Sequence, residues 1–142
     1  MSFEPGGRSV MGVSPPQLAK LIDRLPHPPV AYGANCGTGP AELLLAVAGF
    51  SAAGCERALI AKPNAGVPRY QDGGLIYDAG PEVMAEFAVL ARDLGVRIVG
   101  GCCGTTPAHL SAMRAALQSR PRGPRPTADA ISARIGALMT DR

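Results

Sequence analysis

Three short apolar runs, separated by segments with helical spacing, constrain the fold of this chain most. The runs lie at residues 30–33, 58–61 and 96–99. Strands that alternate with helices of roughly 10 to 15 residues pair in parallel, because each helix carries the chain back to the same end of the sheet. The pattern therefore predicts an α/β fold with a parallel sheet whose two faces are covered by helices.

Prolines and glycines mark the ends of the predicted helices. Each of four helices begins at a proline. The backbone N–H that proline lacks would have no hydrogen-bond acceptor within the first helical turn, so its absence costs nothing there. The expected helices cover about residues 15–25, 40–53, 81–94 and 107–118. Residues 62–74 are expected to form a loop that includes the turn at Asp72, Gly73 and Gly74.

The chain changes character after residue 118. Residues 119–126 alternate Arg with Pro and Gly, a composition that resists both helix and strand, so we expect an exposed basic linker. An amphipathic helix over about residues 128–139 is expected to follow it. The predicted organisation is thus a domain at residues 1–118, a linker at 119–126 and a carboxy-terminal helix at 127–142.

Composition excludes some classes of function. The net charge is only +3, and three Tyr, three Phe and no Trp give little for bases to stack on, so no nucleic-acid partner is expected. No apolar run reaches the roughly 18 residues of a membrane span, and residues 1–8 lack a secretory core, so a cytoplasmic protein is expected. Cytosolic thiols stay reduced, which makes the four cysteines candidates for metal binding, catalysis or simple burial.

Three of the four cysteines follow predicted strands. Cys36 comes after the first apolar run, and Cys102 and Cys103 come after the third. The carboxyl ends of parallel strands lie on one rim, so the three sulfurs should meet there. Glycines beside the Cys102–Cys103 pair would let both side chains turn inward, although neighbours in a strand point to opposite faces.

Three thiolates suit zinc and leave its fourth position open, as in catalytic zinc sites. Their net charge with Zn²⁺ is negative, so the metal would activate a substrate thiol for alkyl transfer better than it would activate water. The residues alone leave alternatives open: Cys102 and Cys103 could form a vicinal disulfide or a redox pair, and Cys36 could be a small buried side chain. Cys55, at a predicted helix end, is expected to be buried.

Other residues near this rim are weaker candidates. Asn35 could orient a ligand or contact substrate, or it could be a turn residue. Thr105 or Thr106 caps the helix at 107–118, whose amino terminus would suit a substrate carboxylate. Lys62 could pair with an anion or be solvated, and His109 is not expected to be a ligand.

Two motifs resemble a known family. Gly-Ala-Asn-Cys at 33–36 and Gly-Gly-Cys-Cys-Gly-Thr-Thr-Pro-Ala-His at 100–109 are similar to the zinc motifs of the homocysteine S-methyltransferase family. That family includes betaine–homocysteine methyltransferase and the homocysteine domain of cobalamin-dependent methionine synthase. Residues 3–14, 62–66 and 77–78 also resemble it. The similarity covers about residues 1–118.

The resemblance implies a specific activity and architecture. Members fold as an eight-stranded α/β barrel of the TIM type, and this chain would supply strands six to eight with their helices. Zinc held by Cys36, Cys102 and Cys103 would bind the homocysteine thiolate, which would take a methyl group to give methionine. No catalytic residue beyond these ligands is implied, and Asn35 and Thr105 are candidate substrate contacts.

The resemblance also implies partners. These are homocysteine, a methyl donor that the sequence does not specify, and either a complementary amino-terminal barrel half or a second copy of the chain. A truncated gene, a misplaced start and a split enzyme would each give such a chain. The alternatives to an enzyme are a non-catalytic zinc-binding barrel fragment or partner subunit and a thiol redox protein.

Overall fold

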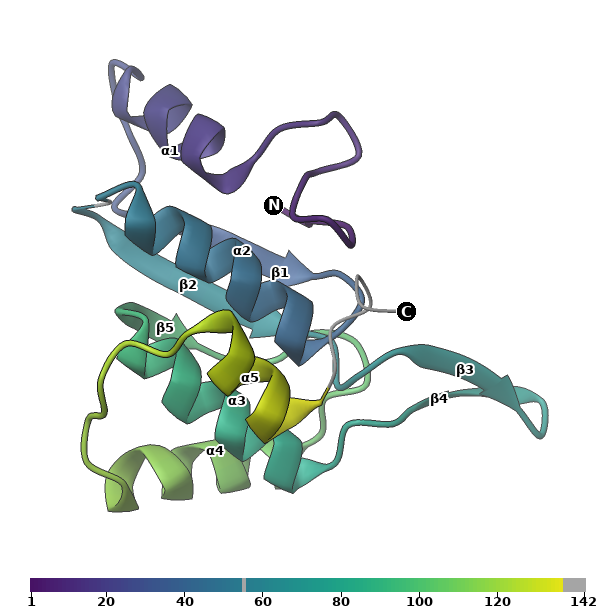
Figure 1. Ribbon diagram of the computed structural model, residues 1–142. Helices are drawn as coiled ribbons and strands as arrows, with labels where there is room; N and C mark the ends of the chain where they lie inside the picture. The colour runs from purple at the N-terminus through teal and green to yellow at the C-terminus, as the bar shows by residue number, and fades with distance from the viewer. Residues whose placement is uncertain (55, 137–142) are drawn as a thin grey trace.

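A three-stranded parallel sheet forms the centre of the protein. The computed structural model describes residues 1–54 and 56–136. The strands are β1 (Ala31–Cys36), β2 (Ala58–Pro63) and β5 (Val96–Val99), in the order β1-β2-β5 (Figure 1). The register pairs Ala34 with Ala61 and Ala61 with Val99, so the carboxyl ends of all three strands lie at one edge. The predicted α/β fold with a parallel sheet is confirmed.

Five helices accompany the sheet in the described part of the chain. The first four begin at a proline, as predicted, and Ser14 caps the first by accepting a hydrogen bond from the Gln17 N–H. They are α1 (Pro15–Asp23), α2 (Pro40–Ala52), α3 (Pro81–Asp93), α4 (Pro107–Ser119) and α5 (Ala128–Ile135).

Helices cover only one face of the described sheet. Tyr32, Ala34 and Leu59 are buried, whereas Ile98, which points to the opposite face, is 46% exposed. The prediction that both faces are covered is therefore wrong for this part of the chain. Right-handed crossovers that always step in the same direction place successive helices on the same side, as α2 and α3 show (Figure 1).

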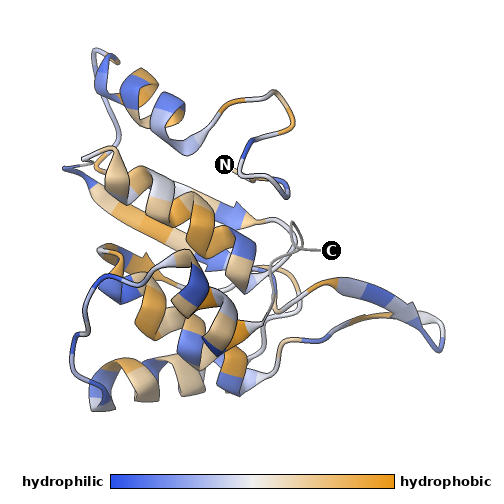
Figure 2. Ribbon diagram, viewed as in Figure 1, coloured by the Kyte–Doolittle hydropathy of each residue, from blue (hydrophilic) through white to orange (hydrophobic). Residues whose placement is uncertain are grey.

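The hydrophobic core lies between the sheet and these two helices. Phe50 of α2 is fully buried, and the rings of Phe3 and Tyr32 meet its ring edge-on, with centroids 5.6 and 5.4 Å away. Phe87 of α3 is equally buried. The hydropathy colouring shows the same concentration of apolar residues on α2 and β2 (Figure 2). The core therefore fixes the covered side of the sheet and leaves the strand ends free.

A β-hairpin stands where a loop was expected. Strands β3 (Pro68–Gln71) and β4 (Gly74–Tyr77) pair antiparallel and project from the body of the protein (Figure 1). Asp72 and Gly73 both have positive φ, 51° and 81°, which is typical of a two-residue hairpin turn. The expected turn was right, but the loop around it was wrong, because the β-prone residues on either side of the Asp-Gly pair were overlooked.

The carboxy-terminal segment packs onto the covering helices. Residues 120–125 are exposed and lie outside helix and strand, whereas Ile131 of α5 is only 1% exposed and belongs to the core. Arg120 and Arg134 both pair with Glu86 of α3. Helix α5 ends at Ile135, whereas the predicted helix runs to residue 139. Residues 137–139 of that prediction lie outside the described residues, as does Cys55. The domain boundaries at 118 and 126 stay a prediction.

In the ranges that the structure describes, no helix combines the length and the apolar character that crossing a membrane requires.

The burial of Ile131 generates a stability prediction. Changing Ile131 to Ala should lower the free energy of unfolding by about 2–5 kcal/mol, because it leaves a cavity where α5 meets the core. Urea denaturation followed by circular dichroism measures this. The exposed Arg122→Ala change should alter stability by less than about 0.5 kcal/mol. Equal stability of the wild type and Ile131→Ala would show that α5 does not pack in solution.

Glu86 generates a pH prediction. Burial alone would raise the pKa of this carboxyl, but hydrogen bonds from Arg120 and Arg134 outweigh burial and lower the pKa. A group with a lowered folded pKa stabilises the fold above its unfolded pKa, about 4.3, and loses that contribution as the pH falls through the folded pKa. Glu86→Gln should thus cost on the order of 1 kcal/mol at pH 7 and nothing in strong acid. A pH-independent difference in urea midpoints would contradict this.

Candidate metal centre

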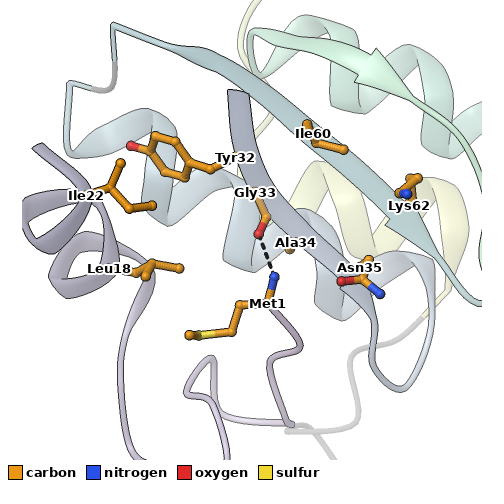
Figure 3. Close-up of a pocket in the computed structure, with 9 residues that line it drawn as sticks. All are labelled: Met1, Leu18, Ile22, Tyr32, Gly33, Ala34, Asn35, Ile60 and Lys62. Atoms are coloured by element: carbon orange, nitrogen blue, oxygen red, sulfur yellow. Dashed lines mark hydrogen bonds between the residues drawn. The ribbon is translucent and has the colours of Figure 1, made fainter. Parts of the chain in front are cut away.

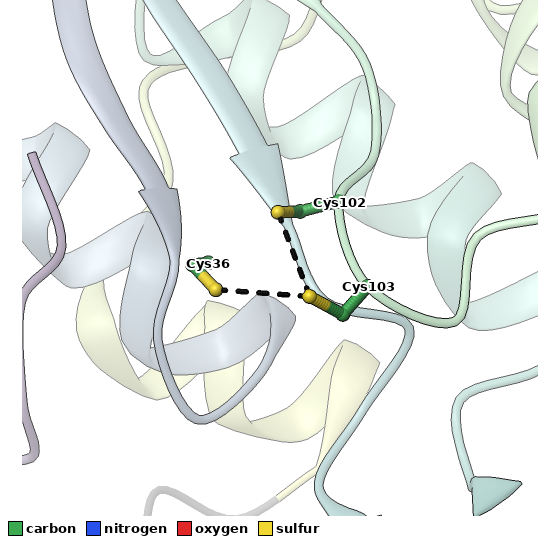
Figure 4. A group of neighbouring side chains, drawn as sticks. All are labelled: Cys36, Cys102 and Cys103. Carbon is green, nitrogen blue, oxygen red and sulfur yellow. Dashed lines mark hydrogen bonds between the residues drawn. The ribbon is translucent and has the colours of Figure 1, made fainter. Parts of the chain in front are cut away.

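The parallel sheet brings three predicted cysteines to one rim. Cys36 is the last residue of β1, and Cys102 and Cys103 follow β5. The Sγ atom of Cys103 lies 4.0 Å from that of Cys36 and 3.9 Å from that of Cys102 (Figure 4). All three sulfur atoms lie within 4.8 Å of one another. They are free thiols, since a disulfide would need a separation of about 2.05 Å.

An unusual backbone conformation aims the Cys36 side chain. Cys36 has φ 64°, in the left-handed region that residues with a Cβ rarely occupy, and Gly37 continues with φ 75°. The glycine therefore extends the left-handed turn, but the cysteine itself also takes an unfavourable angle. Such strain persists only where surrounding contacts hold it in place.

Close contacts explain two of the glycines around the Cys102–Cys103 pair. A Cβ atom at Gly101 would overlap the Thr105 side chain, and one at Gly104 would overlap the ring of Tyr77. Gly104 also has φ 75°. These glycines let the chain turn sharply after β5 while Thr105 and Tyr77 pack against the turn.

Hydrogen bonds fasten the Cys102–Cys103 turn to the end of β2. The N–H of Cys102 donates to the carbonyl of Pro63 over 2.7 Å, and the N–H of Ala65 donates to the carbonyl of Cys103 over 2.9 Å. Asn64 lies between these two positions and also contacts both cysteine-bearing loops. Asn64 was missed as a site residue. Its sequence signals are a polar side chain directly after an apolar strand and its place in residues 62–66, which resemble the family.

The thiols differ in acidity. Burial raises the pKa of Cys36, and the neighbouring sulfurs of Cys102 and Cys103 raise it further. Burial also acts to raise the pKa of Cys102, but hydrogen bonds from the Cys103 backbone N–H, the adjacent thiols and Asn35 bring it below its ordinary value. The side-chain nitrogen of Asn35 lies 4.0 Å from the Cys102 sulfur. The arrangement therefore favours the thiolate more at Cys102 than at Cys36.

The weaker candidate residues differ in their hydrogen-bond partners and in their exposure. Thr105 donates its backbone N–H to the Cys102 carbonyl, and its buried hydroxyl has no hydrogen-bond partner in the described part of the chain. Thr106, not Thr105, is the N-cap of α4. The His109 ring lies 2.8 Å from the Thr106 hydroxyl and 3.0 Å from the Ala79 carbonyl, so it is engaged away from the sulfurs. Lys62 is exposed and lies against Gly100.

Tyr77, at the base of the hairpin, was also not predicted to lie beside the cysteines, although residues 77–78 resemble the family. Its ring covers Gly104, and burial together with the nearby Cys103 sulfur raises the pKa of its phenol. The sulfur cluster is thus bordered by Asn35 on β1 and by Tyr77 on β4. Cys103 is exposed, which leaves a direction of approach from solvent. Three soft donors with one accessible side could hold a single metal ion and admit one further ligand.

Comparison with known proteins gives the same family as the motifs. The family model described as Homocysteine S-methyltransferase matches residues 1–117. A methionine synthase of Mycobacterium tuberculosis (strain ATCC 25618 / H37Rv) is 40% identical over 86 residues, and one of Mycobacterium leprae (strain TN) is 39% identical over 89 residues. Each alignment covers 60% of this chain and 7% of the relative, so the chain matches only a small part of these proteins.

The family match covers residues 1–117 of 142 and includes all three cysteines of the cluster. On this basis, the chain belongs to the homocysteine S-methyltransferase family.

Proposed function

We propose that the chain binds one zinc ion through Cys36, Cys102 and Cys103 and supports methyl transfer to homocysteine. The spacing of the sulfurs carries this proposal. With zinc–sulfur bonds of about 2.3 Å, the edges of a thiolate tetrahedron are about 3.8 Å long. The observed separations of 3.9 and 4.0 Å fit such edges closely. The residues present are thus compatible with the metal that the family resemblance implies.

The proposed chemistry needs little from the protein beyond the ligands. Bound zinc would hold the homocysteine sulfur as a thiolate, a far better nucleophile than the thiol at neutral pH. The Asn35 amide orients the Cys102 sulfur and borders the open side. Thr105, which precedes the N-cap of α4, is proposed as a contact for the substrate, because its hydroxyl has no hydrogen-bond partner in the described part of the chain. Methionine would be the product of the reaction.

We also propose that this sheet is one part of a TIM-type barrel completed by further strands. The Met1 N–H₃⁺ group donates to the Gly33 carbonyl over 3.0 Å (Figure 3). The Asn35 N–H donates to the Met1 carbonyl over 3.1 Å. These two bonds place Met1 opposite Ala34 in the pattern of a parallel strand. This pairing by one residue supports the proposal that a further parallel strand can pair with the outer edge of β1.

A cavity lies along the same edge. Its volume is about 390 Å³, and its walls include Leu18 and Ile22 of α1 and Tyr32 of β1 (Figure 3). Ile60 of β2 also lines the cavity and pairs with the exposed Ile98 of β5, so an apolar surface continues over the uncovered face of the sheet, and we propose that further barrel strands cover it. The proposed partner is a complementary barrel half or a second copy of the chain. A non-catalytic zinc-binding fragment is the alternative.

The zinc proposal makes a direct prediction. Reduced protein should bind about one zinc ion per chain, and changing Cys36, Cys102 or Cys103 to Ser should weaken binding by at least about 100-fold, because each change removes a ligand. Competition with a chromophoric chelator measures the affinity. Cys55→Ala is the matched control and should bind as the wild type does. Unchanged affinity in Cys102→Ser would refute the ligand set.

The barrel proposal makes a second prediction. In sedimentation experiments the isolated chain should self-associate, because its sheet has unpaired edges. It should form no methionine from homocysteine with any single methyl donor, because it lacks the rest of the proposed substrate site. Adding a polypeptide that supplies the complementary strands should restore a defined complex and methionine formation together. A compact monomer that methylates homocysteine alone would contradict this. A defined complex that binds zinc without turnover would favour the non-catalytic alternative.

A further inference from the structure

The imidazole ring of His109 joins the first turn of α4 to the segment that leaves the β3–β4 hairpin. Its Nδ1 atom accepts a hydrogen bond from the Thr106 backbone N–H over 3.1 Å. Because Nδ1 accepts this bond, it carries no proton, and the proton of the neutral ring is on Nε2. The Nε2 atom donates to the Ala79 carbonyl over 3.0 Å. One ring thus caps a helix and also holds a residue 30 positions earlier in the chain.

Ala79 is the point at which the hairpin returns to the body of the protein. It is 7% exposed, and its N–H donates to the Ala65 carbonyl over 2.9 Å. The Ala65 N–H in turn donates to the Cys103 carbonyl over 2.9 Å. The segment that enters the hairpin is therefore joined to the turn that carries Cys103, and the segment that leaves it is joined to α4 by His109.

The polar contacts of Asp78, next to Ala79, do not replace the bond from His109. Asp78 accepts a hydrogen bond from the Val67 N–H over 3.0 Å and pairs with Arg69 over 2.7 Å. Both partners belong to the side of the hairpin that enters from β2. These contacts hold the two sides of the hairpin to each other, but they do not hold the hairpin to α4.

The position of the Tyr77 ring depends on where the hairpin base lies. Tyr77 is the last residue of β4 and precedes Ala79 by two residues. Its ring lies so close to Gly104 that a Cβ atom at that glycine would overlap it. The exposed Cys103 directly precedes Gly104. A displacement of Ala79 would therefore move the ring away from the turn that carries the exposed thiol.

We propose that His109 is a positioning residue that holds the Ala79 carbonyl and thereby keeps the Tyr77 ring packed against the Cys102–Cys103 turn. The ring then shields one side of the exposed Cys103. The inference rests on the proposed function only for its purpose, because Tyr77 borders the side from which a substrate thiol would approach the sulfurs. The contacts themselves are present in the metal-free chain, so they can be tested without zinc.

Two substitutions of the same shape separate the helix cap from the contact with Ala79. His109→Gln keeps an acceptor for the Thr106 N–H and a donor for the Ala79 carbonyl, because an amide carries both. His109→Glu also forms a capping box, but its carboxylate has no donor at pH 7. NMR of the reduced, metal-free chain gives two readouts. These are the shifts of the Gly104 Hα protons, which the Tyr77 ring current displaces, and the exchange rate of the Ala79 amide.

His109→Gln should match the wild type in both readouts. His109→Glu should move the Gly104 shifts toward those of Tyr77→Leu and speed the exchange of the Ala79 amide by about 3–10-fold, as the loss of one hydrogen bond implies. The ratio of Cys103 alkylation rates with a bulky and a small reagent should also rise, and this ratio reports access because the thiolate fraction affects both rates. In the Tyr77→Leu background, His109→Glu should change the ratio no further, because the shielding ring is gone.

Other outcomes would overturn the inference. If His109→Glu and His109→Gln give the same Gly104 shifts and the same Ala79 exchange, His109 only caps α4. The same conclusion follows if exchange speeds up equally at the Arg120 amide, which is bonded at the other end of α4. If His109→Glu does not fold, the uncharged His109→Ala gives the same comparison, with Arg120 again as the control. Failure of the wild type to bind zinc would refute the metal centre, whereas these readouts would still decide the role of His109.

Discussion

The parallel pairing of β2 with both β1 and β5 is the interaction on which the rest of the structure depends. It aligns the carboxyl ends of three strands, so the residues that follow each strand meet on one rim. Cys36, Asn64 and Cys103 come from three different strand ends and would have no reason to be close without this register. The site is therefore a property of the sheet, and any change that shifts the register would separate the sulfurs.

The direction of the crossovers has a second consequence. Because the chain steps from β1 to β2 to β5 without reversing, α2 and α3 lie on the same side and bury Phe50 and Phe87 against the sheet. The other side keeps exposed Ile98 and Lys62. The covered face supplies stability, and the uncovered face lies next to the sulfur cluster. The sulfur cluster is therefore accessible from the face that the helices leave open.

Strain and restraint coexist at the cysteine rim. Cys36 adopts an unfavourable backbone angle, and hydrogen bonds that all begin or end near residues 63–65 hold the surrounding loops. Three thiol groups this close would repel one another once ionised, so the scaffold must keep them together. Asn64 and the backbone at the end of β2 supply that restraint, while Asn35 and Tyr77 border the side from which a ligand can approach.

The sequence by itself determined the parallel α/β fold, the prolines that begin the first four helices and the cysteines that end up together, because these depend on periodicity, on local backbone chemistry and on the topology of parallel strands. Its motifs also identified the family, which the match over residues 1–117 confirmed. Only the tertiary structure decided which face is covered, where α5 packs and how far apart the sulfurs lie. The apolar spacing that includes Ile131 predicts a helix but does not tell whether that residue is buried in the core or exposed to solvent. The Asp72-Gly73 pair predicts a turn but does not tell whether strands lie on either side of it. The hydrogen bonds of Asn64 could not be predicted either, since its partners Gly37 and Cys103 become its neighbours only after the sheet has formed.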